Sequence, residues 1–374
     1  MIFPMAIRRF ALAQVIALLA AGAIHAAASL PPHGPLRILV VGDNVNPHGL
    51  PANQITEVED IAATLAGAGT GLTLAADANA VRLIPTNSIE QATPLLLLPP
   101  TDANYYGVVV YFAHRIPDNS TAADNQLRQD AFAAAMQQYL LAGGGLVSFH
   151  HGAYYWTGKA GILDLIGSTA NGAVPWDTLY GQDVINVAPG QFVSSNGLSY
   201  PGATPYADAV RGVPSGTYPV INNVPDEQYP NFTINANAAG EVKLLFGGKY
   251  SIGDSTPHLL GFTHRRQPWG GVVVGWQPAE YQPNTLNVNG WQFQILANAI
   301  VYASTANITL TLTKGSASDV TLNWTRGQGP NFFVYRASVP NTVIVPVNQI
   351  GSTTLRNFND TPPAGNIFYQ VTEP

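Results

Sequence analysis

The chain has 374 residues, a formal net charge of −6 and no cysteine. The missing cysteine excludes a thiol nucleophile and disulfide bonds. An acidic chain without a run of lysine and arginine also lacks the electrostatic footprint of a protein that binds nucleic acid or an anionic membrane. Because this length exceeds what one hydrophobic core usually supports, we expect two domains.

The N-terminal segment, residues 1–28, has the pattern of a signal peptide. Arg8 and Arg9 precede an apolar stretch, Phe10–Ile24, and three alanines then provide a cleavage site before Ser29. The stretch is shorter than the ~20 apolar residues that span a bilayer, although an uncleaved anchor is the alternative. Only 10% of the residues are charged, against roughly 25% in an average globular protein. We therefore expect a bacterial protein that is secreted or periplasmic.

Residues 29–304 predict an α/β domain. Apolar strands without polar alternation are separated by amphipathic helices, which is typical of a mostly parallel sheet covered on both faces. The predicted strands are 38–41, 72–75, 107–112, the apolar run before His150, 242–246, 258–262 and 272–274, and the predicted helices begin near Thr56, near Thr121 and at Trp291. Residues 167–241 are rich in proline, glycine, asparagine and tyrosine, and we interpret them as a partly irregular covering segment.

Residues 305–374 predict a small all-β unit, because the hydrophobic period changes to two. The predicted strands are 308–313, 320–325, 332–337, 342–347 and 367–372. The pattern resembles a shortened fibronectin type III module, an immunoglobulin-like sandwich, with Trp324 in the second strand and Tyr369 near the tyrosine that this family carries in a late strand. We expect an accessory module without chemistry of its own.

The stretch GGGLVSFHHG, residues 143–152, contains the main candidate for a functional group. Its apolar strand ends in His150 and His151, and the carboxyl ends of strands in an open parallel sheet are where ligands bind. Neither serine nor cysteine stands at this turn, since Ser148 lies inside the strand. An imidazole must therefore act itself, as a base, a metal ligand or a hydrogen-bond donor. Adjacent strand residues point to opposite faces, so His150 is preferred over His151.

Polar residues also follow other strands of the predicted sheet. Histidine and aspartate are costly near a core, so their repeated placement at strand ends predicts one polar cleft at the carboxyl edge of the sheet. Aromatic residues beside the histidines, Tyr155 among them, predict a stacking surface for a sugar ring. The residues that we expect to bind substrate are Asp43, His48, His151, Tyr155, Tyr229, His264 and Gln277, with His114 as a further candidate for the lining of the cleft.

Three motifs in this order resemble the ThuA-like family, the trehalose-utilisation proteins with a class I glutamine amidotransferase-like, flavodoxin-type fold. They are GGGLVSFHHG, the Asp226-Glu227-Gln228-Tyr229 turn and the strand GVVVGW before a terminal helix. The resemblance implies a doubly wound sheet in which a histidine, here His150, replaces the amidotransferase cysteine. It therefore implies that the chain is not a glutamine amidotransferase. The family's Gly-His after the last strand is missing, because Gly275-Trp276-Gln277 stands there.

The sequence supports three functions. The first is that the protein acts on or recognises a carbohydrate or sugar derivative, with His150, Asp226 and Glu227 as catalytic residues. The second is a non-catalytic scaffold that binds a carbohydrate or a surface. The third is a metal-assisted hydrolase whose divalent metal would draw on His48, His150 and Asp226, although no local spacing motif supports such a site.

Overall fold

The computed structural model describes most of the chain outside its first 29 residues. The described residues are 30, 35–43, 57–100, 102–114, 122–171, 181–225, 229, 232–235, 241–250, 256–265, 271–277, 290–305, 309–315, 319–325, 332–338, 346–355 and 357–372. The predicted signal peptide and three predicted site residues, His48, Asp226 and Glu227, lie outside them. None of the helices in the described residues is both long and apolar enough to cross a membrane.

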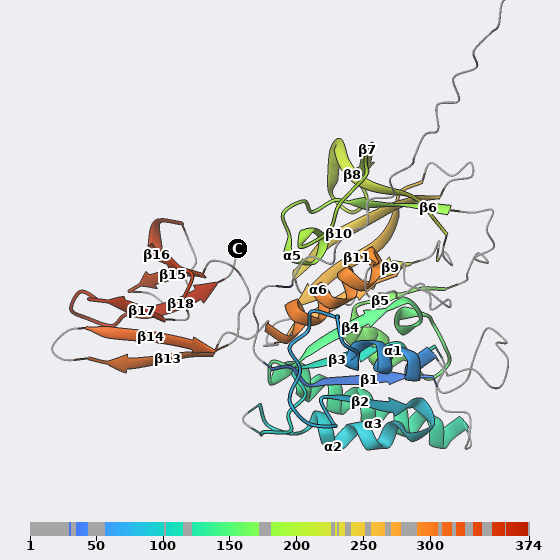
Figure 1. Cartoon of the computed structure of the whole chain (residues 1–374), viewed down its shortest axis with the longest axis horizontal. Helices are drawn as coiled ribbons and strands as arrows, with labels where there is room; N and C mark the ends of the chain where they lie inside the picture. Colours follow the sequence, from blue (N-terminus) through green and yellow to red (C-terminus); the bar gives the residue numbers. More distant parts are fainter. Residues whose placement is uncertain are drawn as a thin grey trace, which may run out of the picture.

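A ten-stranded sheet forms the centre of the larger unit, in the order β2-β1-β3-β4-β12-β11-β10-β6-β8-β7 (Figure 1). Its first five strands are parallel to one another: β2 (Val81–Pro85), β1 (Ile38–Gly42), β3 (Val108–Tyr111), β4 (Gly145–Phe149) and β12 (Val273–Trp276). The predicted strand 72–75 makes only one bridge, between Leu36 and Leu74. The mixed α/β fold with a large central sheet is confirmed.

The other five strands extend the sheet in an antiparallel arrangement. They are β11 (His258–Arg265), β10 (Glu241–Tyr250), β6 (Gly181–Asn186), β8 (Val213–Pro225) and β7 (Gly202–Asp208). Three of them lie within residues 167–241, so the expectation of an irregular covering segment was wrong there. Pro205 and Pro219 lie inside β7 and β8, and proline argues against a central strand but is accepted near the edge of a sheet.

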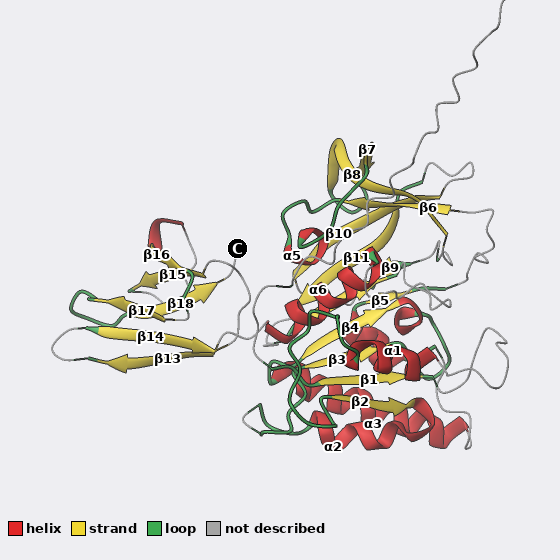
Figure 2. Ribbon diagram, viewed as in Figure 1, coloured by secondary structure: helices red, strands yellow, loops and turns green. Residues whose placement is uncertain are grey.

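Helices cover both faces of the parallel half of this sheet (Figure 2). Alternate residues of β1 divide between two cores: Ile38 and Val40 pack with residues of α1 and α6, whereas Leu39 and Val41 pack with residues of α2, α3 and α4. The helices are α1 (Glu57–Ala66), α2 (Ala92–Leu96), α3 (Ala122–Leu141), α4 (Ala160–Ile166), α5 (Phe192–Ser195) and α6 (Trp291–Thr305). A strand that is buried on both faces needs no polar alternation, which explains the continuous apolar runs.

Two short strands, β5 (Ser168–Thr169) and β9 (Thr233–Ile234), pair with each other outside the large sheet.

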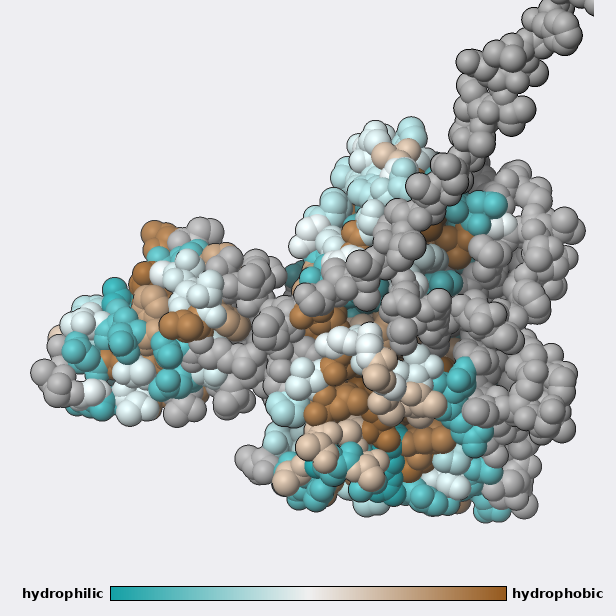
Figure 3. All heavy atoms as spheres, viewed as in Figure 1, coloured by the Kyte–Doolittle hydropathy of each residue, from teal (hydrophilic) through white to brown (hydrophobic). Residues whose placement is uncertain are grey.

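On the face of the molecule that Figure 3 shows, hydrophilic and hydrophobic residues are interspersed.

The C-terminal residues form two antiparallel three-stranded sheets, a separate group of strands in Figure 1. One is β13 (Thr309–Lys314), β14 (Val320–Thr325) and β17 (Asn357–Asp360), and the other is β16 (Gln349–Thr353), β15 (Phe332–Ala337) and β18 (Phe368–Thr372). Trp324 and Phe332, from different sheets, share one apolar core. The predicted antiparallel β unit is thus confirmed, although residues 342–345 of the predicted strand 342–347 lie outside the described part.

Candidate functional site

The site begins where β4 ends and the chain turns into a short 3-10 helix, His150–Ala153. His150 has a φ of 42°, a left-handed conformation that is uncommon for a residue with a side chain. Gly152 makes the turn fit against the sheet, because a Cβ atom there would lie 2.5 Å from both Ser148 Oγ and the carbonyl oxygen of Tyr111. Such strained and tightly packed backbone is frequent at functional sites.

The imidazole of His150 is hydrogen-bonded at both nitrogens. Nδ1 lies 2.8 Å from the main-chain carbonyl oxygen of Gln277, and Nε2 lies 3.1 Å from the hydroxyl of Tyr229. A carbonyl oxygen only accepts, so Nδ1 carries a proton and donates it. In the neutral ring Nε2 is then the basic atom, and it accepts from the Tyr229 hydroxyl. The neighbours of His150 therefore select its tautomer.

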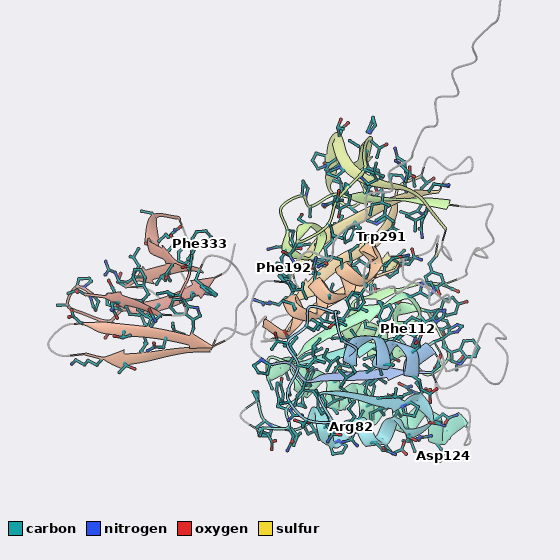
Figure 4. All side chains as sticks on the ribbon, viewed as in Figure 1. Arg82, Phe112, Asp124, Phe192, Trp291 and Phe333 are labelled. Carbon is teal, nitrogen blue, oxygen red and sulfur yellow. The ribbon has the colours of Figure 1, made fainter. Side chains whose placement is uncertain are left out.

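His150 and His151 lie together, on the same side of the turn. Their ring centroids are 4.4 Å apart, and the ring of His151 stacks on that of His114 at 4.7 Å. The expectation that adjacent residues point to opposite faces does not apply, because the strand ends at Phe149 and both histidines belong to the turn. Phe112, labelled in Figure 4, lies beside both rings, 6.3 Å from His150 and 5.0 Å from His151.

The histidines are buried, whereas we expected them to line an open polar cleft. His150 and His151 are each 1% exposed. Tyr229, itself buried, covers His150 with its ring 4.9 Å away. The aromatic residues that follow the turn are more open, since Tyr155 is 50% and Trp156 37% exposed. Trp156 packs edge-on against His114 at 5.8 Å, so it connects the exposed surface to the buried rings.

Asp43 joins the ends of β1 and β3. Its Oδ2 accepts a hydrogen bond from the main-chain N–H of His114 at 2.8 Å, and its Oδ1 accepts from Thr86 Oγ1 at 3.3 Å. The chain leaves β1 for β2 on one side and returns to β3 on the other, so the strand order reverses at this point. Open α/β sheets bind their ligands at such a reversal, outside the carboxyl ends of the strands.

Lys159 is a residue of the site that the sequence reasoning missed. It is fully buried, and its Nζ lies within hydrogen-bond distance of four main-chain carbonyl oxygens, those of Ala113 (2.7 Å), His151 (3.1 Å), Gly152 (3.1 Å) and Tyr154 (2.8 Å). Burial lowers the pKa of Lys159 to about 7, whereas the negative charge of Asp43 acts in the opposite direction. No local signal marks a single lysine in a turn as buried.

Two predicted residues stand differently in the structure. His264 is at the opposite edge of the sheet, because β11 is antiparallel to β12: His264 pairs with Val273, whereas Gly261 pairs with Trp276 at the edge near His150. The expectation that His264 shares the site was therefore wrong. Gln277 is at the site, but the group that contacts His150 is its main-chain carbonyl and not its side-chain amide. His48, Asp226 and Glu227 lie outside the described residues.

The structure brings together Asp43, His150, His151, Tyr229 and the carbonyl of Gln277, with His114 and Lys159 in addition. In the described part of the chain, no group of three or more His, Cys, Asp or Glu side chains is arranged to hold a metal ion. The described arrangement can exchange a proton between His150 and Tyr229 and can offer hydrogen bonds and aromatic surface to a ligand.

No family model and no curated protein matches the chain. Among solved structures, it is similar to a putative ThuA-like protein from Bacteroides uniformis (14% identity, 74% of this chain and 94% of that one, TM-score 0.42) and to another from Parabacteroides merdae (12%, 75% and 94%, TM-score 0.42). It is also similar to part of a carbohydrate deacetylase (14%, 70% and 32%, TM-score 0.38). Similarity at this level concerns the path of the chain and assigns no role to a residue.

Proposed function

We propose that the protein acts on or recognises a carbohydrate or a similar polyol at the carboxyl edge of its parallel strands, with His150 as the central base or hydrogen-bond donor. One observation carries this proposal: the His150 ring is held between a carbonyl oxygen and the Tyr229 hydroxyl. With its proton on Nδ1, the ring can take a proton from the Tyr229 oxygen at Nε2 and return it. General acid–base chemistry at a substrate hydroxyl requires such a group.

The surroundings of His150 support a hydroxyl-rich ligand. The half-exposed Tyr155 and the partly exposed Trp156 present flat apolar faces with polar edges, which match the apolar face and polar rim of a sugar ring. Asp43 is a buried carboxylate at the reversal point of the sheet. We infer that Asp226 and Glu227, which precede Tyr229 by three and two residues, accept hydrogen bonds from sugar hydroxyls, and that one of them assists His150.

The test is a screen of ordinary and oxidised disaccharides with the full chain. Binding is measured by calorimetry, and products are identified by mass spectrometry. We expect the wild-type protein to bind at least one of these sugars and to convert it, and His150→Gln to lose conversion. An unchanged rate in His150→Gln, or no interaction of the wild type with any sugar, would contradict the proposal.

The burial of His150 and His151 favours a second candidate, a carbohydrate-binding protein without catalysis. In that case the two hydrogen bonds of His150 stabilise the turn, and the fold is only a scaffold for a binding surface. The same screen separates the candidates, because binding without any product supports the scaffold and product formation excludes it.

We further infer that the chain is a ThuA-like protein with a flavodoxin-like sheet at residues 29–304, followed by a fibronectin type III-like module at 305–374. The strand order β2-β1-β3-β4-β12 supports the first part, since flavodoxin-like sheets follow the order 2-1-3-4-5. The second part is supported by the core that Trp324 shares with the opposite sheet. Export is supported by residues 1–28 and is tested by N-terminal sequencing of the mature protein, which should begin at Ser29.

A further inference from the structure

Lys159 is buried directly against the histidine turn, and the chemistry proposed above does not use it. Its side chain is 0% exposed, which is rare for a lysine because moving an ammonium group out of water is costly. The four carbonyl oxygens around Nζ, at 2.7 to 3.1 Å, replace the lost water. Packing alone does not explain a lysine at this position, since an apolar side chain of similar length would fill the same space without the cost of burying a charge.

Four converging carbonyl oxygens form a cation site. Each carries partial negative charge, so the four repel one another unless a positive charge lies between them. Rings of backbone carbonyls hold potassium ions in ion channels for the same reason. An ammonium group has three hydrogens for these four acceptors, so its charge, and not its hydrogen bonds alone, balances the cluster. Lys159 thus provides a cation that is tethered to the chain.

The four carbonyls belong to two different parts of the site. The carbonyl of Ala113 follows β3 and directly precedes His114, whereas those of His151, Gly152 and Tyr154 belong to the turn after β4 and the residue behind it. A single ammonium group therefore connects the segment of His114 to the segment of His150 and His151. Removal of the lysine side chain should let these two segments separate and should disturb the stacking of His114 on His151.

We propose that Lys159 is a positioning residue, a tethered cation in a cage of four carbonyls that holds the histidine turn against the end of β3. The proposal rests on the proposed function only in treating the turn as the active centre. The ring of Tyr111 on β3 also lies beside the ammonium, with its centroid 5.6 Å from Nζ, and the negative charge of Asp43 at the end of β1 acts on it electrostatically. Both favour the charged form.

The first experiment compares Lys159→Met with Lys249→Met. Lys249 is a matched control, because its Nζ also donates to a main-chain carbonyl, that of Pro205 at 2.7 Å, and lies 5.7 Å from the ring of Tyr206, but it contacts one carbonyl instead of four. Histidine ring signals are recorded by nuclear magnetic resonance at pH 6. Lys159→Met should shift the signals of His114, His150 and His151, whereas Lys249→Met should leave them unchanged. Equal spectra in the two variants would overturn the proposal.

The second experiment replaces the tether. Lys159→Ala removes three methylenes and the ammonium group, which together correspond to n-propylammonium. Added n-propylammonium should return the histidine signals toward those of the wild type, and tetramethylammonium, which has no N–H donor, should not. Recovery with both cations, or with neither, would contradict a cage that recognises an ammonium group.

A third measurement uses the wild-type protein, so it also tests the proposal if Lys159→Met and Lys159→Ala do not fold. In the wild type at pH 6, the ammonium protons of Lys159 should exchange with water far more slowly than those of Lys249, so that Lys159 gives a sharp ammonium signal and Lys249 does not. Fast exchange at Lys159 would overturn the proposal. All three readouts are independent of any sugar, so a failed sugar screen contradicts the proposed function and leaves this inference to be judged by the histidine and ammonium signals.

Discussion

His150 and His264 have similar sequence contexts and different places in the structure. Each stands at the end of an apolar strand of the same sheet, and each is buried. His150 directly follows β4 of the parallel half, at the edge that also carries Asp43 and the Gln277 carbonyl. His264 pairs with Val242 and Val273 in the antiparallel half, at the other edge. A histidine at the end of a strand therefore indicates a site at the carboxyl edge of the parallel strands only if its own strand runs toward that edge.

The largest expected effect separates these two histidines. His150→Gln removes the basic atom that faces Tyr229, and general acid–base groups typically contribute 10²- to 10⁴-fold, so the rate of sugar conversion should fall by about that factor. His264→Gln should lower the free energy of unfolding by about 1 to 3 kcal/mol, because it replaces a fully buried polar side chain by one of different shape and hydrogen-bonding geometry, and should leave the rate unchanged. Rates are compared at a temperature where both variants are folded. A rate loss in His264→Gln equal to that in His150→Gln would remove the distinction between the edges.

The next effect concerns pH and the buried lysine of the His150 edge. The pKa of Lys159 is lowered to about 7 by burial, whereas a lysine in the unfolded chain keeps a pKa near ~10.4. Between these values the unfolded state holds a proton that the folded state has lost, so the free energy of unfolding should rise with pH, by up to about 5 kcal/mol over the whole window.

Chemical denaturation between pH 6.5 and 10.5 measures this rise. Lys159→Met should lose it, and Lys249→Met should keep it. The same pH dependence in wild type and Lys159→Met would mean that Lys159 is not the group responsible.

A third prediction tests how tightly the His150 edge is built. In Gly152→Ala the new Cβ would meet Ser148 Oγ and the carbonyl of Tyr111 at 2.5 Å, so the variant should lose about 3 kcal/mol of stability, at the upper end for overpacking. Gly107→Ala, just before β3 at the other edge, should change stability little, because among the described residues the new Cβ would meet only Ser304 Cβ, at an ordinary van der Waals distance of 3.8 Å. Comparable denaturation midpoints for the two variants would show that the turn yields easily.

The smallest expected effect is at the surface beside the turn. Tyr155→Ala should weaken sugar binding by about 0.5 to 1.5 kcal/mol, the range for an aromatic contact beyond its buried area, and should leave the catalytic rate at saturation unchanged. Phe368→Ala is the control, since Phe368 is a partly exposed aromatic residue of the C-terminal sheets. Affinity is measured by titration calorimetry. If Phe368→Ala weakens binding as much as Tyr155→Ala does, the ligand does not depend on the His150 edge.

The sequence pattern was sufficient for the elements that are buried on both faces. The predicted strands 38–41 and 107–112 correspond to β1 and β3, and the helix predicted from Trp291 corresponds to α6. The sequence pattern did not predict β2, whose residues Val81–Pro85 are mostly half-buried, or the proline-containing strands β7 and β8. Strands near an edge bury less apolar surface, so their residues are less constrained and their period is weaker.

The sequence by itself determined that a mixed α/β unit precedes a small antiparallel one, and that a strand of the first ends next to His150, because periodicity and the cost of burying polar groups are local properties. Only the tertiary structure decided that His264 lies at the far edge, that Gln277 acts through its main chain, and that Lys159 lies among four carbonyls. Strand direction, backbone hydrogen bonds and the burial of a charge all depend on segments that are distant in the chain, and no local pattern records them.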